Sequence, residues 1–401
     1  MKVLLINSVC GIKSTGRICT DLAQILEKSG HECKVAYGRE QVPENVEKFG
    51  FKFTDDTSVK LDALKTRLTD NAGFNSKKAT ARLIKWIKEY APDIIHLHNI
   101  HGYYINISML FKFLKEYSKP VVWTLHDCWA FTGHCAHFSL AGCDRWKTGC
   151  FNCIQKSAYP SSLFLDMSVR NFKAKKELFT SLENLTIVTP SKWLADTAKQ
   201  SFLGKYNIIP IPNGVDLELF KKSESNFRKD HGLEGKKIIL GAATAWTESK
   251  GIYEFSRLAE IVPEGYKVVL VGVNKEQWQQ KLSSKLLLIE KTNSIQQMAE
   301  IYSASDVFIN ASREETMGLT TVEAMACGTP AIASPYTAVP EVIQTCGGIV
   351  TDDISAKGLL DAVNLMFSKE YPQTRENAKL YEKNQQYQKY IDIYNKIYTE
   401  N

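Results

Sequence analysis

Short apolar runs separated by helical stretches repeat along the chain. The first run covers residues 2–8, a loop containing two glycines follows at 11–16, and an amphipathic stretch at 17–29 leads to a second run at 31–38. A short, continuous apolar run predicts a buried parallel strand, and a 3.6-residue period predicts a helix. Their alternation predicts a doubly wound α/β fold.

The alternation continues to the end of the chain. Further buried strands are expected at residues 93–99, 120–129, 185–190, 236–241, 266–272 and 306–312. Residues 40–80 are polar and weakly patterned, which predicts a loop with a short helix. Pro210 and Pro212 stand around an apolar run and mark the clearest boundary between two domains.

Composition agrees with a soluble globular protein. The 401 residues suffice for two domains of ordinary size, and the contents of 44% apolar and 23% charged residues are ordinary. A net charge of +6 is too small to indicate a nucleic-acid partner by itself. No apolar run reaches the roughly 20 residues needed to span a bilayer, and the N-terminus reads as a strand rather than a signal peptide. We therefore expect a cytoplasmic protein.

The stretch that follows the strand at 306–312 carries the clearest candidate chemistry. Glu315 and Glu323 are eight residues apart, and Gly318 lies between them near the expected start of a helix. Free amides at a helix start attract an anion such as a phosphate, while carboxylates accept hydrogen bonds from sugar hydroxyls. The spacing fits a pocket for a nucleotide-linked sugar, and an ordinary strand–loop–helix with surface glutamates fits it equally well.

These residues, together with EAMACGTPAIAS at 323–334, resemble the hallmark of retaining glycosyltransferase family 4, with Met317 where the family often has Phe. That family has the GT-B fold, in which two Rossmann-like doubly wound domains face a central cleft. The resemblance implies that Glu323 holds the ribose of the donor and that Glu315 contacts the transferred sugar. The backbone amides of Met317, Gly318 and Leu319 would meet the sugar and the diphosphate.

The family's diphosphate-binding cation is matched only in part. Lys250 stands where the family has its diphosphate-binding lysine, but Thr244 occupies the position of the usual partner arginine six residues earlier. The leaving group would then be stabilised by Lys250 and helix dipoles, or by an arginine from elsewhere such as Arg17 or Arg313.

Candidates in the first half of the chain come from strand ends. His126 matches a family histidine that faces the transferred sugar, where a neutral imidazole could bind the sugar and stabilise charge at the anomeric carbon. A histidine satisfied in the core is the alternative. By the resemblance, Thr15 and Gly16 would approach the donor phosphates, unless their loop is only a tight turn. Three more histidines cluster at one strand end, for which an acceptor contact is preferred over a metal site: His96, His98 and His101.

Four cysteines lie within 19 residues: Cys135, Cys143, Cys150 and Cys153. In a reducing compartment this density indicates a tetrathiolate metal site, for which Zn²⁺ is the preferred ion. Cys128, His134 or His137 could replace one ligand, and an iron–sulfur cluster or free thiols are the alternatives. Such a zinc would be structural, because four protein ligands leave no open position. The sequence contains no Asp-x-Asp motif, so no catalytic metal is expected.

The expected organisation is an acceptor-side domain at 1–206 with a Cys-rich insertion at 128–153, a nucleotide-sugar domain at 207–375 and a helix at 376–401 that crosses back to the first domain. The chain would move a sugar from a nucleotide diphosphate sugar, UDP-linked before GDP-linked, to a polysaccharide or lipid-linked acceptor. The motifs resemble those of family 4 enzymes from bacterial surface-polysaccharide clusters.

Two alternatives remain open from the sequence. One is a GT-B phosphorylase or sugar-nucleotide epimerase, and the other is a non-catalytic zinc-containing binding protein. The basic stretch 170–179 reads as a solvated face, or as a contact with anionic lipid at the inner side of the membrane, through Arg170, Lys173, Lys175 and Lys176. The sequence names neither the sugar, the base, the acceptor nor the linkage.

Overall fold

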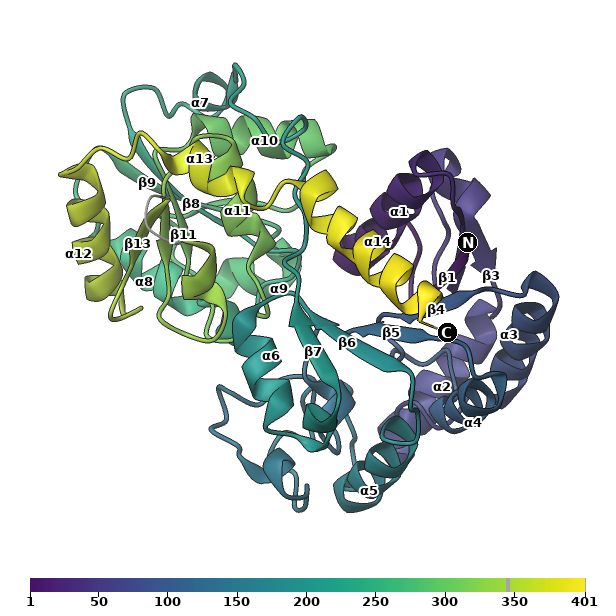
Figure 1. Cartoon of the computed structure of the whole chain (residues 1–401). Coiled ribbons are helices and arrows are strands. Elements are labelled where there is room, and N and C mark those ends of the chain that lie inside the picture. Colours follow the sequence, from purple (N-terminus) through teal and green to yellow (C-terminus); the bar gives the residue numbers. More distant parts are fainter. Residues whose placement is uncertain (344–346, 401) are drawn as a thin grey trace. The chain divides into compact units, whose positions relative to one another are not determined.

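The computed structural model describes residues 1–343 and 347–400. The chain forms two compact units (Figure 1), one made of Met1–Pro212 with Tyr387–Asn401 and the other of Asn213–Gln386. Each unit is built on its own parallel sheet. The predicted α/β, doubly wound fold class is therefore confirmed.

The first unit contains a seven-stranded parallel sheet in the order β3-β2-β1-β4-β5-β6-β7. Its strands are β1 (Lys2–Asn7), β2 (Glu32–Tyr37), β3 (Gly50–Lys52), β4 (Ile94–Leu97), β5 (Val121–Thr124), β6 (Leu185–Thr189) and β7 (Asn207–Pro210). The apolar runs form central strands because helices bury both faces of the sheet. β7 pairs with β6, so the chain leaves this sheet at Pro210 rather than before residue 207.

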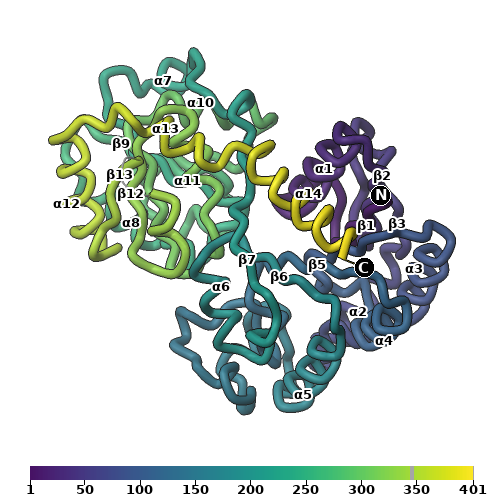
Figure 2. Tube along the Cα trace, in the orientation of Figure 1, coloured from purple at the N-terminus to yellow at the C-terminus, as the bar shows by residue number. Residues whose placement is uncertain are grey.

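Helices cover the two faces of the first sheet. They are α1 (Lys13–Lys28), α2 (Asp56–Thr69), α3 (Lys77–Tyr90), α4 (Ile107–Tyr117), α5 (Ser168–Phe179), α6 (Lys192–Lys199) and the C-terminal α14 (Lys383–Thr399). Leu22 of α1 and Tyr390 of α14 share a core cluster with Val3 and Leu5 on one face. Figure 2 shows the traces of α1 and α14 beside each other. The other face of β1 packs in a second cluster with residues of α3, α4, α5 and α6.

The second unit contains a six-stranded parallel sheet in the order β10-β9-β8-β11-β12-β13. Its strands are β8 (Lys237–Ala242), β9 (Tyr266–Val271), β10 (Leu287–Ile289), β11 (Val307–Asn310), β12 (Ala331–Ala333) and β13 (Gly348–Val350). Its helices are α7 (Phe227–Asp230), α8 (Ile252–Ile261), α9 (Lys275–Trp278), α10 (Ile295–Ala304), α11 (Leu319–Ala326), α12 (Ala356–Phe367) and α13 (Thr374–Lys379). Residues of α10, α11 and α13 cover one face of the sheet, while residues of α8, α9 and α12 cover the other.

Short 3₁₀ helices connect these elements. They are η1 (Glu44–Phe49), η2 (Trp129–Phe131), η3 (Arg145–Lys147), η4 (Phe202–Lys205), η5 (Glu248–Lys250), η6 (Gln279–Lys281) and η7 (Val339–Val342). No helix in the described part of the chain has the length and apolar character needed to cross a membrane.

Each sheet has one point at which the strand order reverses direction. In the first unit it lies between β1 and β4, and in the second between β8 and β11. Ligands of open α/β sheets bind at the carboxyl ends of the strands at such a point. The loops after these four strands are therefore the places to look for a site.

Two local predictions differ from the structure. Residues 40–80 contain the full helix α2, which Asp55 caps by accepting from the Ser58 amide at 2.8 Å. Helix α1 begins at Lys13 instead of Arg17, so Gly16 lies in the helix and not in a loop. Glycine at this position leaves room for Val9. A Cβ added to Gly16 would lie only 3.0 Å from Val9 Cγ2.

Candidate functional site

Two loops at the reversal point of the second sheet bring Lys250 and Glu315 together. Lys250 ends η5 after β8, Glu315 follows β11, and the Lys250 Nζ donates to Glu315 Oε2. The two side chains are 29% and 22% exposed. Gly251, with φ of 77°, permits the close approach, because an added Cβ would lie 2.7 Å from the Ala311 Cβ. The predicted cation and the predicted sugar carboxylate thus form one ion pair.

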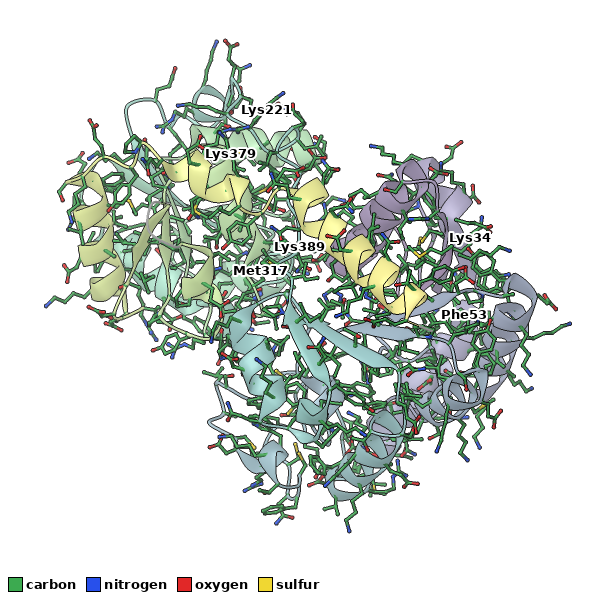
Figure 3. All side chains as sticks on the ribbon, in the orientation of Figure 1. Lys34, Phe53, Lys221, Met317, Lys379 and Lys389 are labelled. Atoms are coloured by element: carbon green, nitrogen blue, oxygen red, sulfur yellow. The ribbon has the colours of Figure 1, made fainter. Side chains whose placement is uncertain are left out.

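Helix α11 begins beside this pair. Gly318 is its N-cap with φ of 90°, a conformation that favours glycine. The amides of the first turn have no acceptor within the helix, and the helix dipole makes this end positive. Met317, labelled in Figure 3, is buried, and its Sδ accepts from the Asn213 amide at 3.1 Å. Its side chain therefore contributes to packing, and only its backbone is available to a ligand.

Glu323 lies one turn further along α11. The hydroxyl of Tyr302, from α10, donates to Glu323 Oε2 at 3.0 Å. Tyr302 is fully buried, so it fixes the carboxylate from inside the unit. The sequence did not indicate Tyr302, because a tyrosine on an amphipathic helix reads as a core residue.

Of the two arginines considered as substitutes for the missing cation, Arg313 already has a carboxylate partner, and Arg17 belongs to the first unit. Arg313 forms an ion pair with Glu254, Nη2 to Oε1 at 2.7 Å, so its charge is already balanced. Arg17 lies on α1 of the first unit, where its Nε donates to the Lys13 carbonyl at 3.3 Å. Lys250 is therefore the cation at the matched positions of the second unit.

In the first unit, His126 lies after β5 and pairs with His98 after β4. His98 Nδ1 and His126 Nε2 are 3.0 Å apart, and the two rings are stacked at an interplanar angle of 15°. Burial lowers the pKa of His126 to about 4 and holds the pKa of His98 well below its usual range. Both rings are therefore neutral at neutral pH, and one of them donates to the other.

The surroundings of His98 select the donor of that pair. His98 Nε2 is buried and makes no hydrogen bond in the structure. A buried N–H without an acceptor is rarer in proteins than a buried acceptor without a donor. His98 therefore carries its proton on Nδ1 and donates to His126. In this arrangement His126 carries its own proton on Nδ1 and can act as a hydrogen-bond donor through that atom.

Two tyrosines of α14 support the histidine behind this pair. His96 Nδ1 contacts the Tyr394 hydroxyl at 2.5 Å, and His96 Nε2 contacts Thr124 Oγ1 at 2.8 Å. The Tyr390 hydroxyl reaches the same Thr124 Oγ1 at 3.2 Å. The ring centroids of His96 and His98 are 4.1 Å apart. The C-terminal helix is thus linked by hydrogen bonds to the strands that carry the histidine pair.

A histidine–aspartate pair lies at the same end of the first sheet. His101 Nε2 lies 2.8 Å from Asp127 Oδ2, and His101 Nδ1 lies 3.2 Å from the Tyr159 hydroxyl. Burial alone would raise the pKa of the Asp127 carboxyl, but the charge and hydrogen bond of His101 hold that pKa well below its usual range. Residues of both pairs line a small pocket together with Asn99.

The loop with Thr15 closes on itself. Asn7 Nδ2 donates to Thr15 Oγ1 at 3.3 Å, and the Gly11 amide donates to the Gly16 carbonyl at 3.0 Å. Thr15 therefore lies in the first turn of α1, at the reversal point between β1 and β4. Its place at the start of a helix agrees with an anion contact, and the internal bonds agree equally with a structural turn.

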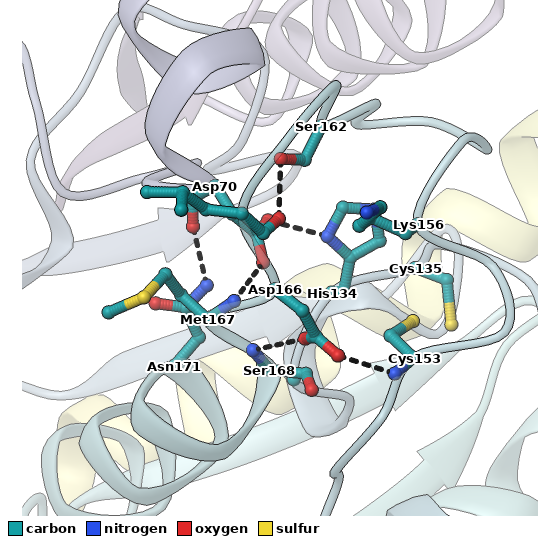
Figure 4. A network of polar contacts seen from close by, with 12 residues as sticks. Asp70, His134, Cys135, Cys153, Lys156, Ser162, Asp166, Met167, Ser168 and Asn171 are labelled. Carbon is teal, nitrogen blue, oxygen red and sulfur yellow. Dashed lines mark hydrogen bonds and ion pairs between the residues drawn. The ribbon is translucent and has the colours of Figure 1, made fainter.

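The four cysteines lie near one another in the chain segment after β5. Cys135 and Cys153 share a side-chain hydrogen bond, and the Gly133 amide donates to Cys150 Sγ at 3.1 Å. Figure 4 shows the side chains of Cys135 and Cys153 next to each other. Within residues 1–343 and 347–400, no three His, Cys, Asp or Glu side chains are placed to hold a metal ion. The arrangement therefore gives no support to the predicted zinc at Cys135, Cys143, Cys150 and Cys153, nor to a metal at the clustered histidines.

His134, an alternative ligand in the prediction, is bound to a carboxylate instead. Its Nδ1 contacts Asp70 Oδ1 at 2.5 Å, while Asp70 Oδ2 accepts from the Met167 amide at 2.7 Å (Figure 4). Burial alone would lower the pKa of His134, but the hydrogen bond and charge of Asp70 raise it. The pair joins the end of α2, the cysteine loop and the start of α5.

Lys175 departs from the predicted solvated basic face on 170–179, of which Arg170, Lys173 and Lys176 are exposed. Its side chain is buried, and Nζ donates to the carbonyls of Trp129 at 2.8 Å and Thr132 at 3.1 Å. Nζ also lies 3.4 Å from the centroid of the Trp129 ring. Burial lowers the pKa of Lys175 to about 7. The hydrogen bonds of Lys175 stabilise the loop after β5. Because its side chain is buried, Lys175 cannot contact a lipid surface.

Comparison with known families identifies the chain. The family described as Glycosyltransferase Family 4 matches residues 15–219, just over half of the chain, and Glycosyl transferases group 1 matches residues 223–386. The chain belongs to glycosyltransferase family 4. The resemblance inferred from the motifs is confirmed, and the protein is a glycosyltransferase.

Relatives in sequence and solved structures of similar fold are known for this family 4 glycosyltransferase. The colanic acid biosynthesis glycosyl transferase WcaC of Escherichia coli is 28% identical over 283 residues, which cover 68% of this chain and 67% of that protein. Sucrose-phosphate synthase from Thermosynechococcus elongatus has a TM-score of 0.73 at 15% identity, over the whole of both chains. HepE from Anabaena, solved with UDP and glucose, has a TM-score of 0.68 at 15% identity and covers 99% of this chain and 100% of its own. These likenesses show the GT-B fold.

Proposed function

We propose that this glycosyltransferase moves a sugar from a nucleotide diphosphate sugar to a polysaccharide or lipid-linked acceptor, with retention of anomeric configuration. The observation that carries the proposal is the Lys250–Glu315 pair, which lies at the reversal point of the second sheet beside the start of α11. One cation, one carboxylate and a positive helix end are the groups that a diphosphate and a sugar need.

The donor is proposed to separate the ion pair when it binds. Lys250 would then contact the diphosphate, and Glu315 would accept from a hydroxyl of the transferred sugar. The backbone amides of Met317, Gly318 and Leu319 would meet the sugar and phosphates. Glu323, oriented by Tyr302, would accept from the ribose hydroxyls.

The first unit is proposed to supply the acceptor side. His126, neutral and able to donate through Nδ1, would bind the transferred sugar, while Thr15 and Gly16 would approach the phosphates. In the mechanism implied by the family, the leaving phosphate deprotonates the incoming hydroxyl on the face from which it departs. Catalysis then consists of positioning and of stabilising the leaving diphosphate, with no obligatory protein nucleophile.

UDP-linked sugar is the preferred donor and GDP-linked sugar the second choice. The similar HepE was solved in complex with UDP and glucose, and WcaC is named for colanic acid biosynthesis. Both support a nucleotide sugar and a glycan acceptor here. A cytoplasmic location, with contact at the inner face of the membrane, fits such an acceptor.

Calorimetric titration with UDP, GDP, ADP and CMP tests the donor site. Wild type is expected to bind one nucleoside diphosphate with micromolar affinity, and Lys250→Ala is expected to lower that affinity and to cut turnover at least tenfold. Equal binding and near-normal turnover in the variant would show that another cation holds the diphosphate.

The rival activities differ in what they consume. A phosphorylase would use free phosphate, and an epimerase would convert the nucleotide sugar without an acceptor. Incubation of the enzyme with a radiolabelled UDP-sugar and no acceptor separates them from a transferase. Release of UDP only in the presence of an acceptor glycan is the outcome that we expect.

The cysteine loop is proposed to have a structural role. A zinc ion there is predicted by the sequence but has no support from the side-chain arrangement. Elemental analysis of protein purified without a histidine tag decides the matter. One equivalent of zinc would restore the prediction, and less than about a tenth of an equivalent with reactive thiols would remove it.

A further inference from the structure

Helix α2 turns its leucines outward. Leu61, Leu64 and Leu68 are 52%, 54% and 41% exposed, whereas Asp62 and Thr66 are buried. Residues three and four positions apart lie on the same side of a helix, so the three leucines form one ridge. This is the reverse of the usual pattern, in which leucines face the core and acidic residues face water.

Hydrogen bonds hold α2 in this orientation. Asp62 accepts from Thr66 Oγ1 at 3.2 Å, from Asn75 Nδ2 at 3.0 Å and from Ser76 Oγ. Turning the leucines inward would break these bonds and expose a well-satisfied carboxylate while leaving polar partners buried. The exposed ridge is therefore built into the first unit and is not a matter of side-chain rotamers.

A second apolar segment lies beside the ridge. Leu163, Phe164 and Leu165 are 60%, 70% and 48% exposed. The Leu163 amide donates to the Arg67 carbonyl at 2.8 Å, which places the segment against the last turn of α2. We call the six side chains the outer apolar surface: Leu61, Leu64, Leu68, Leu163, Phe164 and Leu165.

Positive charges accompany the outer apolar surface. Lys60, Lys65 and Arg67 on α2 are exposed, and Lys156 Nζ donates to the Phe164 carbonyl at 3.2 Å. Large apolar side chains next to lysine and arginine fit the interface of an anionic bilayer. The apolar side chains enter the boundary of the acyl chains, and the lysines and arginines bind the lipid phosphates. A protein partner would gain less from flexible lysines, which are depleted from protein interfaces.

We propose that the outer apolar surface docks onto bilayers that contain anionic phospholipid. The chain segment that carries Phe164 also carries Tyr159, whose hydroxyl contacts His101 in the pocket of the first unit. Docking would therefore bring a membrane-embedded, lipid-linked acceptor toward the acceptor-side histidines. That consequence rests on the proposed function, whereas bilayer binding itself does not.

Vesicle flotation of the full chain, without nucleotide or acceptor, tests the proposal. We expect binding to vesicles of phosphatidylcholine with phosphatidylglycerol, little binding to phosphatidylcholine alone, and weaker binding at high salt. Leu64→Ser combined with Phe164→Ser should lower the partition coefficient at least tenfold. Lys65→Glu combined with Arg67→Glu should remove the preference for anionic lipid.

Matched controls exclude a general loss of apolar surface or of folding. Leu365→Ser with Leu380→Ser changes two leucines of the second unit that are 45% and 51% exposed, and should leave binding unchanged. The surface variants should keep the wild-type melting temperature and nucleotide affinity. Unchanged vesicle binding in the surface variants would overturn the proposal. So would a dimer of the wild type that the surface variants fail to form, because the surface would then bind a second copy of the chain. A wild type that binds nucleotide but no vesicle would overturn it and leave the proposed function intact.

Discussion

At the scale of single residues, Lys250 and Glu315 neutralise each other in an ion pair. The pair is partly buried, so each charge is screened less than it would be at the surface. In the proposed donor site, a diphosphate would have to draw Lys250 away from Glu315 before it gained the full charge of the lysine. The carboxylate would then oppose nucleotide binding while it bound the sugar.

Glu315→Gln should separate these two effects. Removing the competing charge is expected to tighten UDP binding roughly fivefold, or about 1 kcal/mol. Turnover should fall at least tenfold, because the sugar loses a charge-assisted hydrogen bond worth about 1.5–3 kcal/mol. Calorimetry and steady-state kinetics measure the two changes. Glu248→Gln, an exposed carboxylate of η5, is the control and should alter neither.

Glu323→Ala tests the ribose contact. The loss of a charge-assisted bond should weaken UDP binding by about 1.5–3 kcal/mol, since Glu323 is the proposed acceptor for ribose hydroxyls. Inorganic pyrophosphate has no ribose, so its binding should not change. If UDP binds the variant as tightly as wild type, the ribose assignment is wrong.

Burial of His98 makes stability depend on pH. The unfolded chain protonates this histidine below about pH 6.5, whereas the folded chain keeps it neutral to a much lower pH. Above about pH 6.5, neither state binds a proton at His98. Below about pH 6.5, the free energy of unfolding falls by up to about 1.4 kcal/mol per pH unit for one histidine. His134 opposes this trend, because its pKa is raised.

A comparison of wild type with His98→Gln isolates this contribution. The stability difference between them, measured by urea unfolding, should narrow as the pH falls from 6.5 to 5. Histidines that do not contact His98 contribute equally to both proteins and cancel, whereas His96 and His126 do contact it. A constant difference over this range would show that His98 binds a proton as readily in the folded state as in the unfolded state.

At the scale of elements, α14 completes the first unit through hydroxyl groups as well as apolar contacts. Tyr394 is fully buried and contacts His96 Nδ1 at 2.5 Å. Tyr398 lies on the same helix and is 49% exposed. The two tyrosines differ in burial and partner but not in chemistry, so they form a matched pair for mutation.

Tyr394→Phe should lower the free energy of unfolding by about 1–3 kcal/mol, because it leaves a buried ring nitrogen without a partner. Tyr398→Phe should change it by less than about 0.5 kcal/mol. Thermal or urea unfolding measures both. Equal effects of the two substitutions would mean that the bond to His96 adds nothing to stability.

The elements also show where sequence patterns stop being informative. The parallel strands could be predicted because helices bury both of their faces, which leaves a continuous apolar run. The inverted helix α2 could not, because its orientation depends on Asn75 and Ser76, which bond Asp62 from outside the helix. Lys175 was likewise placed in solvent, since its carbonyl partners come from a distant loop.

At the scale of the whole molecule, the two-sheet fold and the family followed from a few motifs. Glu315 was a candidate from its spacing to Glu323, and Lys250 was one from the resemblance to family 4. The sequence could not predict three contacts, because each joins residues far apart in the chain. They are the Lys250–Glu315 pair, the Tyr302 contact to Glu323 and the His98–His126 pair. The expected zinc stays a prediction, which the positions of the cysteine side chains in the described part of the chain do not support.

The division of α14 between the units has a consequence for biosynthesis. Residues up to Gln386 belong to the second unit, while those from Tyr387 belong to the first. On a translating ribosome, Met1–Pro212 emerges early but lacks Tyr390 and Tyr394 until all of Asn213–Gln386 has been made. Until then, part of the core of the nascent first unit is uncovered, and His96 Nδ1 lacks its Tyr394 partner. For this chain, the unit that is synthesised first is the last to be finished.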